Sequence, residues 1–453
     1  MRVLLVNSNS VCIISFKSLF ILAVAGLGPA TQNKGLMNRI YLICFSLLFS
    51  VWACNEPAPE AHPGKPEKRL RESYDPSKKK DWDRMEEQAK GTTVNLMMWQ
   101  GDPLINAYMQ NYVVPQVKER YDIDLQIANG QGNTIVQILL AELEAGKPKS
   151  ELDLMWINGE TFYQLRQINA LFGPWTTALP NTQFINFENP FIGIDFQQEV
   201  DGYECPWGNV QLALIYNEAE VPEPPRTLEG LLEFAKQHPG KFTFDVGFTG
   251  LTLLKSWMIS FAESPEELSG AFNEEKYQKY SQQLWDYIGE LRPYLWKEGA
   301  TFPESVAPMH QMFANGELWF TMSNNDAEVD NKIAQGLFPE SARAFVFESG
   351  TIQNSHYMGI PRFSANKNGA MAVVNFLISP EAQLKKADPT VWGDGTILAM
   401  DKLPKDVRMQ FDSIPNRVYA PKRSDIQQNA LMELAPEYMI RLAEDFRTKI
   451  IEQ

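Results

Sequence analysis

The sequence predicts an α/β protein with enough residues for two domains. Short runs rich in β-branched and aromatic residues alternate with apolar-periodic segments of about 10–15 residues, a pattern typical of mostly parallel α/β sheets. The run 152–158, LDLMWIN, is nearly continuous in its apolar character, as expected for a strand buried on both faces. A chain of 453 residues is too long for one ordinary core and long enough for two domains.

The first half of the folded part begins at Gly91 with a β-rich run, 92–99, followed by Gln-Gly-Asp-Pro. We expect an apolar-periodic helix from there to Tyr121, kinked at Pro115 because proline removes a backbone donor. The next expected elements are strands at 122–128 and 152–158, a helix at 133–145 ended by Gly146, and a helix from Glu160.

The second half repeats this alternation. A helix is expected at 227–238, with Thr227 as its N-cap and Gly240 after its end. The other expected strands are 211–217, 241–246, 318–323, 344–348 and 356–360, and the other expected helices are 251–262, 264–272, 273–295, 304–314, 326–335, 366–378 and 426–451.

Two apolar stretches precede the folded part. The first, 11–26, is interrupted by Lys17, and neither stretch reaches the roughly 20 residues that a membrane-spanning helix needs. The second has a positive start at Met37-Asn38-Arg39, an apolar run at 40–51, and Ala53 before Cys54, and it resembles a bacterial lipoprotein signal apart from its Trp52.

That resemblance implies that Cys54 carries a lipid and begins the mature chain. We therefore expect a signal region at 1–53 whose true start is Met37; the alternative is a core helix or a plain membrane anchor. Residues 54–90 are rich in Pro, Lys and Glu and predict a flexible tether. Lipid and tether together would hold the protein at a membrane surface, in the periplasm or on the cell surface.

Composition excludes several classes of function. The net charge of −15 argues against nucleic acid as a main partner. The four histidines are scattered and no Cys/His pair has metal-ligand spacing, so neither a metal site nor a cofactor is predicted. Without the signal region only Cys54 and Cys205 remain; they could pair, but we expect Cys205 to be a buried small hydrophobe.

Two longer motifs carry a resemblance to a known family. FANGELWFTMSNNDAE at 313–328 and HYMGIPRFSANKNGAMAVVNFLISPEAQLKK at 356–386 resemble the strand-and-loop signatures of bacterial extracellular solute-binding proteins of ABC importers. WQGDPLIN at 99–106, DLMWINGETF at 153–162 and CPWGNVQLALIYN at 205–217 resemble a subgroup described as thiamine-type or uncharacterised.

The resemblance implies the type II periplasmic-binding-protein fold, with two α/β lobes, a hinge and a ligand cleft between them. The implied chain path crosses near 208–211, near Ala344 and near 388–392. Lobe one is then 91–208 plus 344–388, and lobe two is 209–343 plus 389–453.

Candidate ligand-binding residues follow from position, because solutes bind beyond the carboxyl ends of strands in open α/β sheets. Asp102 would contact ligand, hold a cation or cap the next helix, and Asn158-Gly159 would contact ligand or form a tight turn. Trp207 is expected outside any strand, facing the cleft, with core packing as the alternative. Asn324 and Asn325 are ligand contacts or a capping pair. The full set is Trp99, Gln100, Gly101, Asp102, Asn158, Gly159, Glu160, Trp207, Gly208, Asn209, Thr249, Gly250, Ser323, Asn324 and Asn325.

The resemblance implies a monomeric, non-catalytic receptor that delivers a small solute to the permease subunits of an ABC importer. Aromatic faces with carboxylates suit a thiamine-like cation or an amine, and the same inventory suits a sugar. The first alternative is a lipid-anchored carbohydrate-active hydrolase that uses a carboxylate pair. The second is an adhesion or assembly lipoprotein. The sequence has no G-x-S-x-G, H-E-x-x-H or P-loop pattern.

Overall fold

The computed structural model describes residues 3–7, 10–14 and 75–452, in two units divided after Lys68. In the first unit, β1 (Val3–Asn7) and β2 (Ser10–Ile14) pair antiparallel. The predictions about Met37 and Cys54 fall outside the described residues. Within the described part, no helix is both long and apolar enough to cross a membrane.

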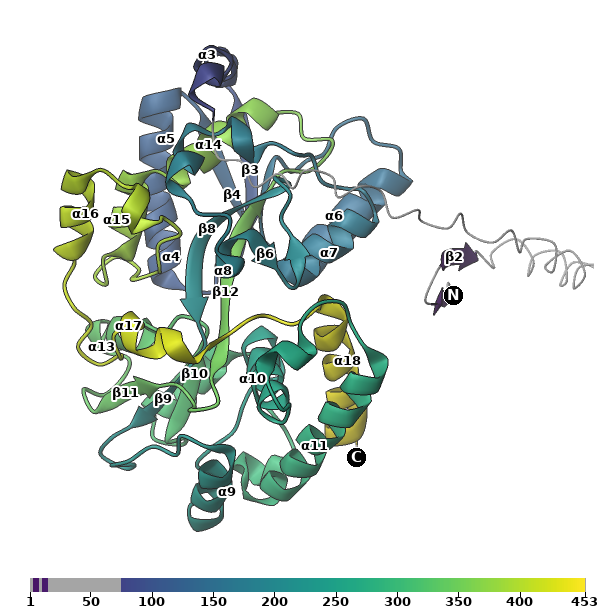
Figure 1. Cartoon of the computed structure of the whole chain (residues 1–453), viewed down its shortest axis with the longest axis vertical. Helices are drawn as coiled ribbons and strands as arrows, with labels where there is room; N and C mark the ends of the chain where they lie inside the picture. The colour runs from purple at the N-terminus through teal and green to yellow at the C-terminus, as the bar shows by residue number, and fades with distance from the viewer. Residues whose placement is uncertain (1–2, 8–9, 15–74, 453) are drawn as a thin grey trace, which may run out of the picture. The chain divides into compact units, whose positions relative to one another are not determined.

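The second unit contains two α/β lobes, which Figure 1 shows one above the other. Lobe one is built around a six-stranded sheet in the order β13-β12-β5-β3-β4, with β8 also paired to β12. The strands β4 and β5 run parallel to β3, and β12 runs antiparallel to β5. The strands are β3 (Thr93–Met98), β4 (Asp124–Asn129), β5 (Leu154–Ile157), β8 (Glu204–Gln211), β12 (Thr351–Gly359) and β13 (Ala430–Leu431).

Helices pack around this sheet through apolar faces. In α14 every residue from Gly369 to Leu377 is buried, so this helix lies within the core of lobe one. The expected kink at Pro115 falls beside a π-helical turn, Met109–Val113, that separates α4 from α5. The helices of lobe one are α4 (Pro103–Tyr108), α5 (Val114–Tyr121), α6 (Gly132–Glu144), α7 (Gly159–Gln167), α8 (Pro190–Gly193), α14 (Lys367–Leu377), α15 (Pro380–Ala387) and α16 (Lys405–Asp412).

Lobe two is built around a three-stranded sheet in the order β10-β9-β11. Both β10 and β11 run antiparallel to β9, so the expectation of a mostly parallel sheet is wrong for this lobe. The reason is that β9 enters the lobe from the hinge, whereas β10 and β11, which flank it, run in the opposite direction. The elements are β9 (Ala213–Asn217), β10 (Phe320–Ser323), β11 (Ala342–Phe345), α9 (Leu228–Gln237), α10 (Phe248–Ser260), α11 (Glu274–Leu291), α12 (Val306–Ala314), α13 (Glu328–Ala334), α17 (Arg423–Ile426) and α18 (Pro436–Phe446).

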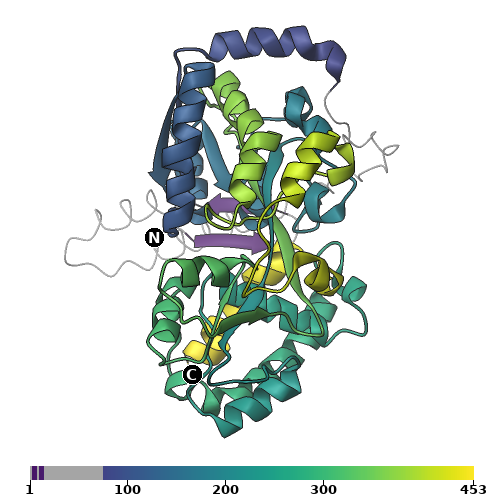
Figure 2. The same ribbon diagram turned by 90° about the vertical axis from the view of Figure 1, so that its left-hand side faces the viewer.

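Two long strands connect the lobes. β8 and β12 pair antiparallel from Gln211↔Gln353 to Glu204↔Gly359, and Figure 1 shows them running side by side between the two sheets. Figure 2 shows the same connection from the side, with the blue α4–α5 column ending at the junction with the lower lobe. Two lobes joined by a few strands are the arrangement that hinge closure requires.

The structure differs from the expected tether, because part of 54–90 is a helix. α3 (Lys79–Ala89) buries Trp82 and Ala89 in the core of lobe one, with Met85 packed against the same core. These three residues repeat at helical spacing and form one apolar stripe. The composition of 54–90 as a whole does not reveal this stripe, because the segment is rich in Pro, Lys and Glu.

Other differences lie in lobe two and at the lobe boundary. The expected strand at 241–246 is not a strand, and the expected helix at 426–451 is broken by β13. The sequence places 389–453 in lobe two, but Trp392, Leu398 and Leu403 of this segment pack in the core of lobe one. The exact division of the chain into lobes stays a prediction.

Candidate functional site

The candidate site lies where the two lobes meet, at the ends of β3 and β5 in lobe one and of β10 in lobe two. An ion pair from Asp102 to Lys332 of α13 links the first and third of these strand ends. Glu160, after β5, faces Lys255 of α10 electrostatically, and Thr249 of α10 accepts a 3.2 Å hydrogen bond from Asn324 after β10. The structure therefore brings together candidate residues from four separate segments.

Asp102 caps α4, as one of the alternatives expected. Its Oδ1 accepts hydrogen bonds from the backbone N–H groups of Leu104 (2.8 Å) and Ile105 (3.2 Å). Its Oδ2 accepts from Lys332 Nζ at 2.7 Å, and the same ammonium lies 2.8 Å from Glu328 Oε1. Burial alone lowers the pKa of Lys332, but the two carboxylates outweigh it and raise that pKa above its ordinary value.

The three residues before Asp102 form a closely folded loop. A Cβ on Gly101 would lie 2.3 Å from the indole of Trp99, so glycine allows the half-buried indole to fold over the backbone. The loop is fixed by Gln100, whose N–H donates to Asn129 Oδ1 at 3.1 Å and whose carbonyl accepts from Asn106 Nδ2 at 2.9 Å.

The segment after β5 begins helix α7. Asn158 occupies the N-cap position, and its Oδ1 accepts a long hydrogen bond from Thr161 Oγ1 at 3.4 Å. Gly159 packs closely against Phe196, so that an added Cβ at position 159 would lie 2.0 Å from the phenyl ring. Glu160 is half-buried, and burial raises the pKa of its carboxyl even though nearby Lys255 lowers it.

In lobe two, Gly250 allows the first turn of α10 to approach the preceding loop. A Cβ at this position would lie 1.7 Å from the carbonyl oxygen of Asp245. After β10, Ser323 Oγ accepts from the N–H of Asn325 at 3.0 Å, and Asn325 Oδ1 accepts from the N–H of Ala327 at 3.0 Å. Ser323 and Asn325 therefore hold the loop, whereas the side chain of Asn324 is directed to Thr249.

Trp207 lies within β8 and is 0% exposed, so the expectation that it sits outside any strand is wrong. Tyr357 pairs with Pro206 and His356 pairs with Gly208, which leaves Trp207 as the extra residue of a β-bulge. The prediction took Pro206 and Gly208 as signs of a loop, but a β-bulge within a strand also accommodates proline and glycine.

The bulge turns the Trp207 indole into an aromatic cluster in lobe one. Its ring centre lies 4.9 Å from that of Trp156, 5.4 Å from His356 and 5.3 Å from Trp392. A Cβ at Gly208 would lie 1.8 Å from His356 Nε2, so this glycine is required for the close packing of the histidine ring.

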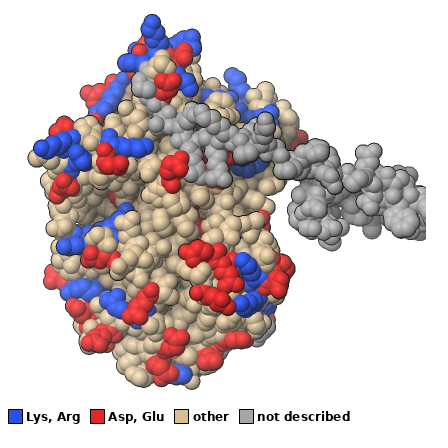
Figure 3. Space-filling model, viewed as in Figure 1, with Lys and Arg blue, Asp and Glu red and all other residues tan. Residues whose placement is uncertain are grey.

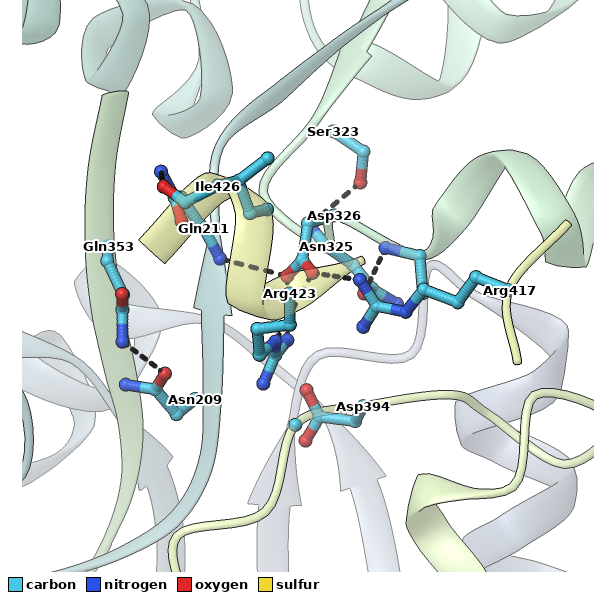
Figure 4. A network of polar contacts seen from close by, with 12 residues as sticks. Asn209, Gln211, Ser323, Asn325, Asp326, Gln353, Asp394, Arg417, Arg423 and Ile426 are labelled. Atoms are coloured by element: carbon cyan, nitrogen blue, oxygen red, sulfur yellow. Dashed lines mark hydrogen bonds and ion pairs between the residues drawn. The ribbon is translucent and has the colours of Figure 1, made fainter. Parts of the chain in front are cut away.

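Asn209 connects the two hinge strands, as Figure 4 shows. Its Oδ1 accepts from Gln353 Nε2 at 2.7 Å, and its Nδ2 donates to Ser355 Oγ at 3.0 Å, both on β12. Beside it, Asp326 accepts from the N–H of Gln211 at 3.2 Å and from Arg423 Nη2 at 2.7 Å.

Asp326 is buried, and its hydrogen bonds join four segments: β8, the loop after β10, the loop that carries Arg417, and α17. Burial raises the pKa of this carboxyl, but Arg423 and Arg417 outweigh burial and hold the pKa well below its usual range. Asn209 and Asp326 thus fix the hinge region.

Sequence reasoning missed Lys332, Lys255 and Phe196. A signal existed for Lys255, which is the only charged residue in the apolar helix α10, FTGLTLLKSWMIS. A lone charge in such a helix indicates a buried partner. Lys332 gave no such signal, because its partner Asp102 lies 230 positions away in the sequence.

The surface of the second unit carries both signs of charge. In Figure 3 acidic side chains gather around the position of α18, the helix that carries Glu437, Glu444 and Asp445. Together with the net charge of −15, this surface mildly favours cationic over anionic solutes.

Two α/β lobes, two connecting strands and candidate contacts from both lobes define a solute-binding protein of the two-lobed class. Comparison with known families agrees: residues 112–407 match the bacterial extracellular solute-binding protein family. The chain is also 38% identical over 337 residues to the protein YnjB of Escherichia coli (strain K12), covering 74% of this chain and 86% of the relative. The chain belongs to the bacterial extracellular solute-binding protein family.

Solved structures of the same fold include proteins described with different solutes. The spermidine/putrescine ABC transporter substrate-binding protein PotD of Streptococcus pneumoniae matches with a TM-score of 0.54 and 14% identity, covering 79% of this chain and 100% of that one. AfuA of Actinobacillus pleuropneumoniae, with fructose-6-phosphate bound, matches with a TM-score of 0.55 and 13% identity, covering 80% and 99%. The type II periplasmic-binding-protein fold is therefore confirmed, and the fold by itself does not select the solute. The hydrolase alternative gains no support from these relatives.

Proposed function

We propose that this protein is the extracytoplasmic receptor of an ABC importer, which binds a small solute between its lobes and presents it to the permease subunits. The observation that carries the proposal is the meeting of candidate loops from both lobes at one junction, with β8 and β12 as the hinge. Closure around a solute converts contacts from both lobes into one enclosed site.

For the solute we favour a small organic cation, a thiamine-like compound or an amine, with a sugar as the alternative. Trp99 offers an aromatic face, and Glu160 is a half-buried carboxylate. Among the residues that the structure describes, Lys255 is the charged neighbour that affects the pKa of Glu160. A cation beside Glu160 would lower the pKa of this carboxyl and stabilise its ionised form. The proposed contacts are Trp99, Gln100, Gly101, Asn158, Gly159, Glu160, Thr249, Gly250, Ser323, Asn324 and Asn325.

We propose that four of the candidate residues have structural roles alone and do not contact the solute. Both carboxylate oxygens of Asp102 are occupied, and Trp207, Gly208 and Asn209 lie in the hinge strand β8. We propose that these residues shape the hinge and the lobe junction, and that the solute contacts the remaining set.

We also propose lipid attachment at Cys54, which keeps the receptor at a membrane near its permease. The support is the pattern around Cys54 in the sequence. Mass spectrometry of the protein purified from bacterial membranes measures it directly. A mature chain beginning at Cys54 with added acyl mass is expected, and an unmodified Cys54 would contradict the anchor.

Solute binding is tested by thermal shift and calorimetry of the full chain against thiamine, spermidine and glucose. A solute at 100 times its Kd raises stability by about 2.7 kcal/mol. Saturable binding of thiamine or spermidine that weakens at least tenfold in Glu160→Gln supports the cation. Binding of glucose alone would support a sugar as the solute. Turnover of a glycoside would support the alternative that the protein is a hydrolase.

The matched control is Glu290→Gln, which removes an exposed carboxylate on α11. This substitution changes the net charge of the protein by the same amount. Equal loss of affinity in both variants would mean that only the overall field attracts the solute, and would exclude Glu160 as a direct contact.

A further inference from the structure

An ion pair crosses between the lobes at the end of β3. Lys332 Nζ lies 2.7 Å from Asp102 Oδ2 and 2.8 Å from Glu328 Oε1. Asp102 belongs to lobe one, and the other two residues belong to α13 of lobe two. The side chains of Lys332 and Asp102 are only 6% and 11% exposed, so water and salt screen the pair weakly. We propose that Asp102 and Lys332 form a latch that stabilises the closed arrangement of the lobes before any solute binds. The inference rests on the proposed function.

The geometry of Asp102 is fixed in advance. Its Oδ1 accepts from two backbone N–H groups of α4, so the carboxylate keeps its position whether or not Lys332 is present. A charge held in place by a helix cap loses little conformational entropy when its partner arrives. Asp102 therefore acts as a preformed receptor for the Lys332 ammonium.

A second contact supports the docking of α13 on lobe one. Asn331 Nδ2 donates a 2.6 Å hydrogen bond to the carbonyl of Trp392, whose ring lies in the aromatic cluster with Trp207. The next residue, Gly393, has a positive φ of 74° and passes close to Ala327 at the start of α13. Lys332 and Asn331 thus reach lobe one at two neighbouring places.

The arrangement of charges makes the latch reversible. When the lobes separate, Lys332 keeps its partner Glu328 one helical turn away, so no buried cation is left alone in lobe two. Asp102 keeps its helix cap and gains water. Opening therefore costs the inter-lobe attraction without the penalty of orphaning a buried charge.

A latch of this kind acts on affinity without touching the solute. The apparent affinity of a receptor falls in proportion to the fraction of molecules in the binding-competent state. Stabilising the closed state beforehand raises the affinity for any solute that fits. Asp102 and Lys332 are therefore positioning residues that set how readily the lobes close.

The test measures the distance between the lobes in solute-free, full-length protein. Spin labels are placed at Glu119→Cys on α5 and Glu290→Cys on α11, both exposed, in a chain with Ser at positions 12, 44 and 54. Pulsed electron paramagnetic resonance then reports the closed and open populations. Asp102→Asn is the main variant, because Asn retains a side-chain oxygen for the helix cap while removing the charge.

Asp102→Asn is expected to lower the ratio of closed to open molecules by about tenfold, the factor that corresponds to ~1.4 kcal/mol. Lys332→Gln shifts the distribution in the same direction, and Asp102→Asn adds nothing further in the Lys332→Gln background. Glu274→Gln, which breaks an exposed ion pair with Arg441 within lobe two, leaves the distances unchanged.

An unchanged distance distribution in Asp102→Asn overturns the latch, and so do shifts that simply add in the double variant. Neither result decides whether the protein binds a solute at all, which is measured separately by calorimetry. Failure of the latch and failure of the receptor function are therefore distinguishable.

Discussion

Lys255 Nζ lies 2.6 Å from Glu433 Oε1, and the two side chains are only 0% and 4% exposed. The same ammonium lies 4.4 Å from the centre of the Phe196 ring, which packs against Gly159. The Phe196 ring therefore lies between a buried ion pair in lobe two and the segment that follows β5 in lobe one. The pair carries a specific expectation for stability, because each charge depends on the other for compensation.

Lys255→Met should destabilise the protein strongly by leaving Glu433 buried without its partner. Loss of one member of a buried ion pair typically costs about 3–5 kcal/mol. Urea unfolding followed by tryptophan fluorescence measures the free energy of unfolding. Lys236→Met, which breaks an exposed pair with Glu233, is the control and should leave the free energy of unfolding almost unchanged. Equal effects from the two substitutions would contradict this account.

Gly208→Ala should also destabilise the protein, by about 1–3 kcal/mol, because the added Cβ would lie 1.8 Å from His356 Nε2 and 2.2 Å from Asp394 Oδ2. The matched control is Gly289→Ala in α11, where no atom lies within 4 Å of an added Cβ. Alanine in an open helix position should stabilise by about 0.5–1 kcal/mol. Opposite shifts in the urea midpoint are expected, and two stabilising substitutions would show that the strand accommodates a side chain.

The elements predictable from the sequence are those fixed by local signals. Thr227 was expected to cap a helix and does so, with its Oγ1 accepting from the N–H of Gly230 at 3.1 Å. A cap depends on residues three or four positions apart, so it is visible in the sequence. The α/β class followed from the alternation of strand and helix patterns, and the two lobes followed from the family resemblance carried by the motifs at 313–328 and 356–386.

The parts that sequence reasoning missed depend on distant neighbours. Trp207 is buried because β12 pairs with Pro206 and Gly208 and leaves the indole in a bulge, a register that no local pattern reveals. One carboxylate oxygen of Asp102 caps α4, and the other accepts from Lys332. The sequence indicated only the cap, because Lys332 lies far along the chain. The sequence thus indicated candidate residues at the ends of strands, but it did not indicate which distant residues they contact.

A buried carboxyl pair in lobe one predicts a pH dependence of stability. Burial, reinforced by Glu433, raises the pKa of Asp195 well above its ordinary 3.8; burial, reinforced by Asp195, raises the pKa of Glu204 well above 4.5. No described side chain donates a hydrogen bond to either oxygen of Glu204, so we expect this carboxyl pair to retain a proton above the ordinary carboxyl pKa values.

The folded protein therefore binds more protons than the unfolded chain, at pH values between the ordinary carboxyl pKa and the raised ones. In that window these two groups make stability fall as the pH rises, by about 1.4 kcal/mol per pH unit for each extra proton. Glu204→Gln removes one titrating group and should flatten the slope of urea midpoint against pH. An identical slope in both proteins would show that this pair does not hold the proton.

His310 predicts the opposite sign between about pH 4 and pH 6.5. Its Nε2–H donates to the carbonyl oxygen of Met322 at 3.1 Å inside lobe two, and burial lowers the pKa of the imidazole from 6.5 to about 4. The unfolded chain binds a proton below pH 6.5 that the folded protein does not, so this histidine's contribution is complete above pH 6.5 and declines as the pH falls toward 4. Titration of the His310 ring by NMR should give a midpoint near 4. His238→Gln, at the partly exposed end of α9, is the control that leaves this midpoint in place, whereas a His310 midpoint near 6.5 would mean that the ring is hydrated.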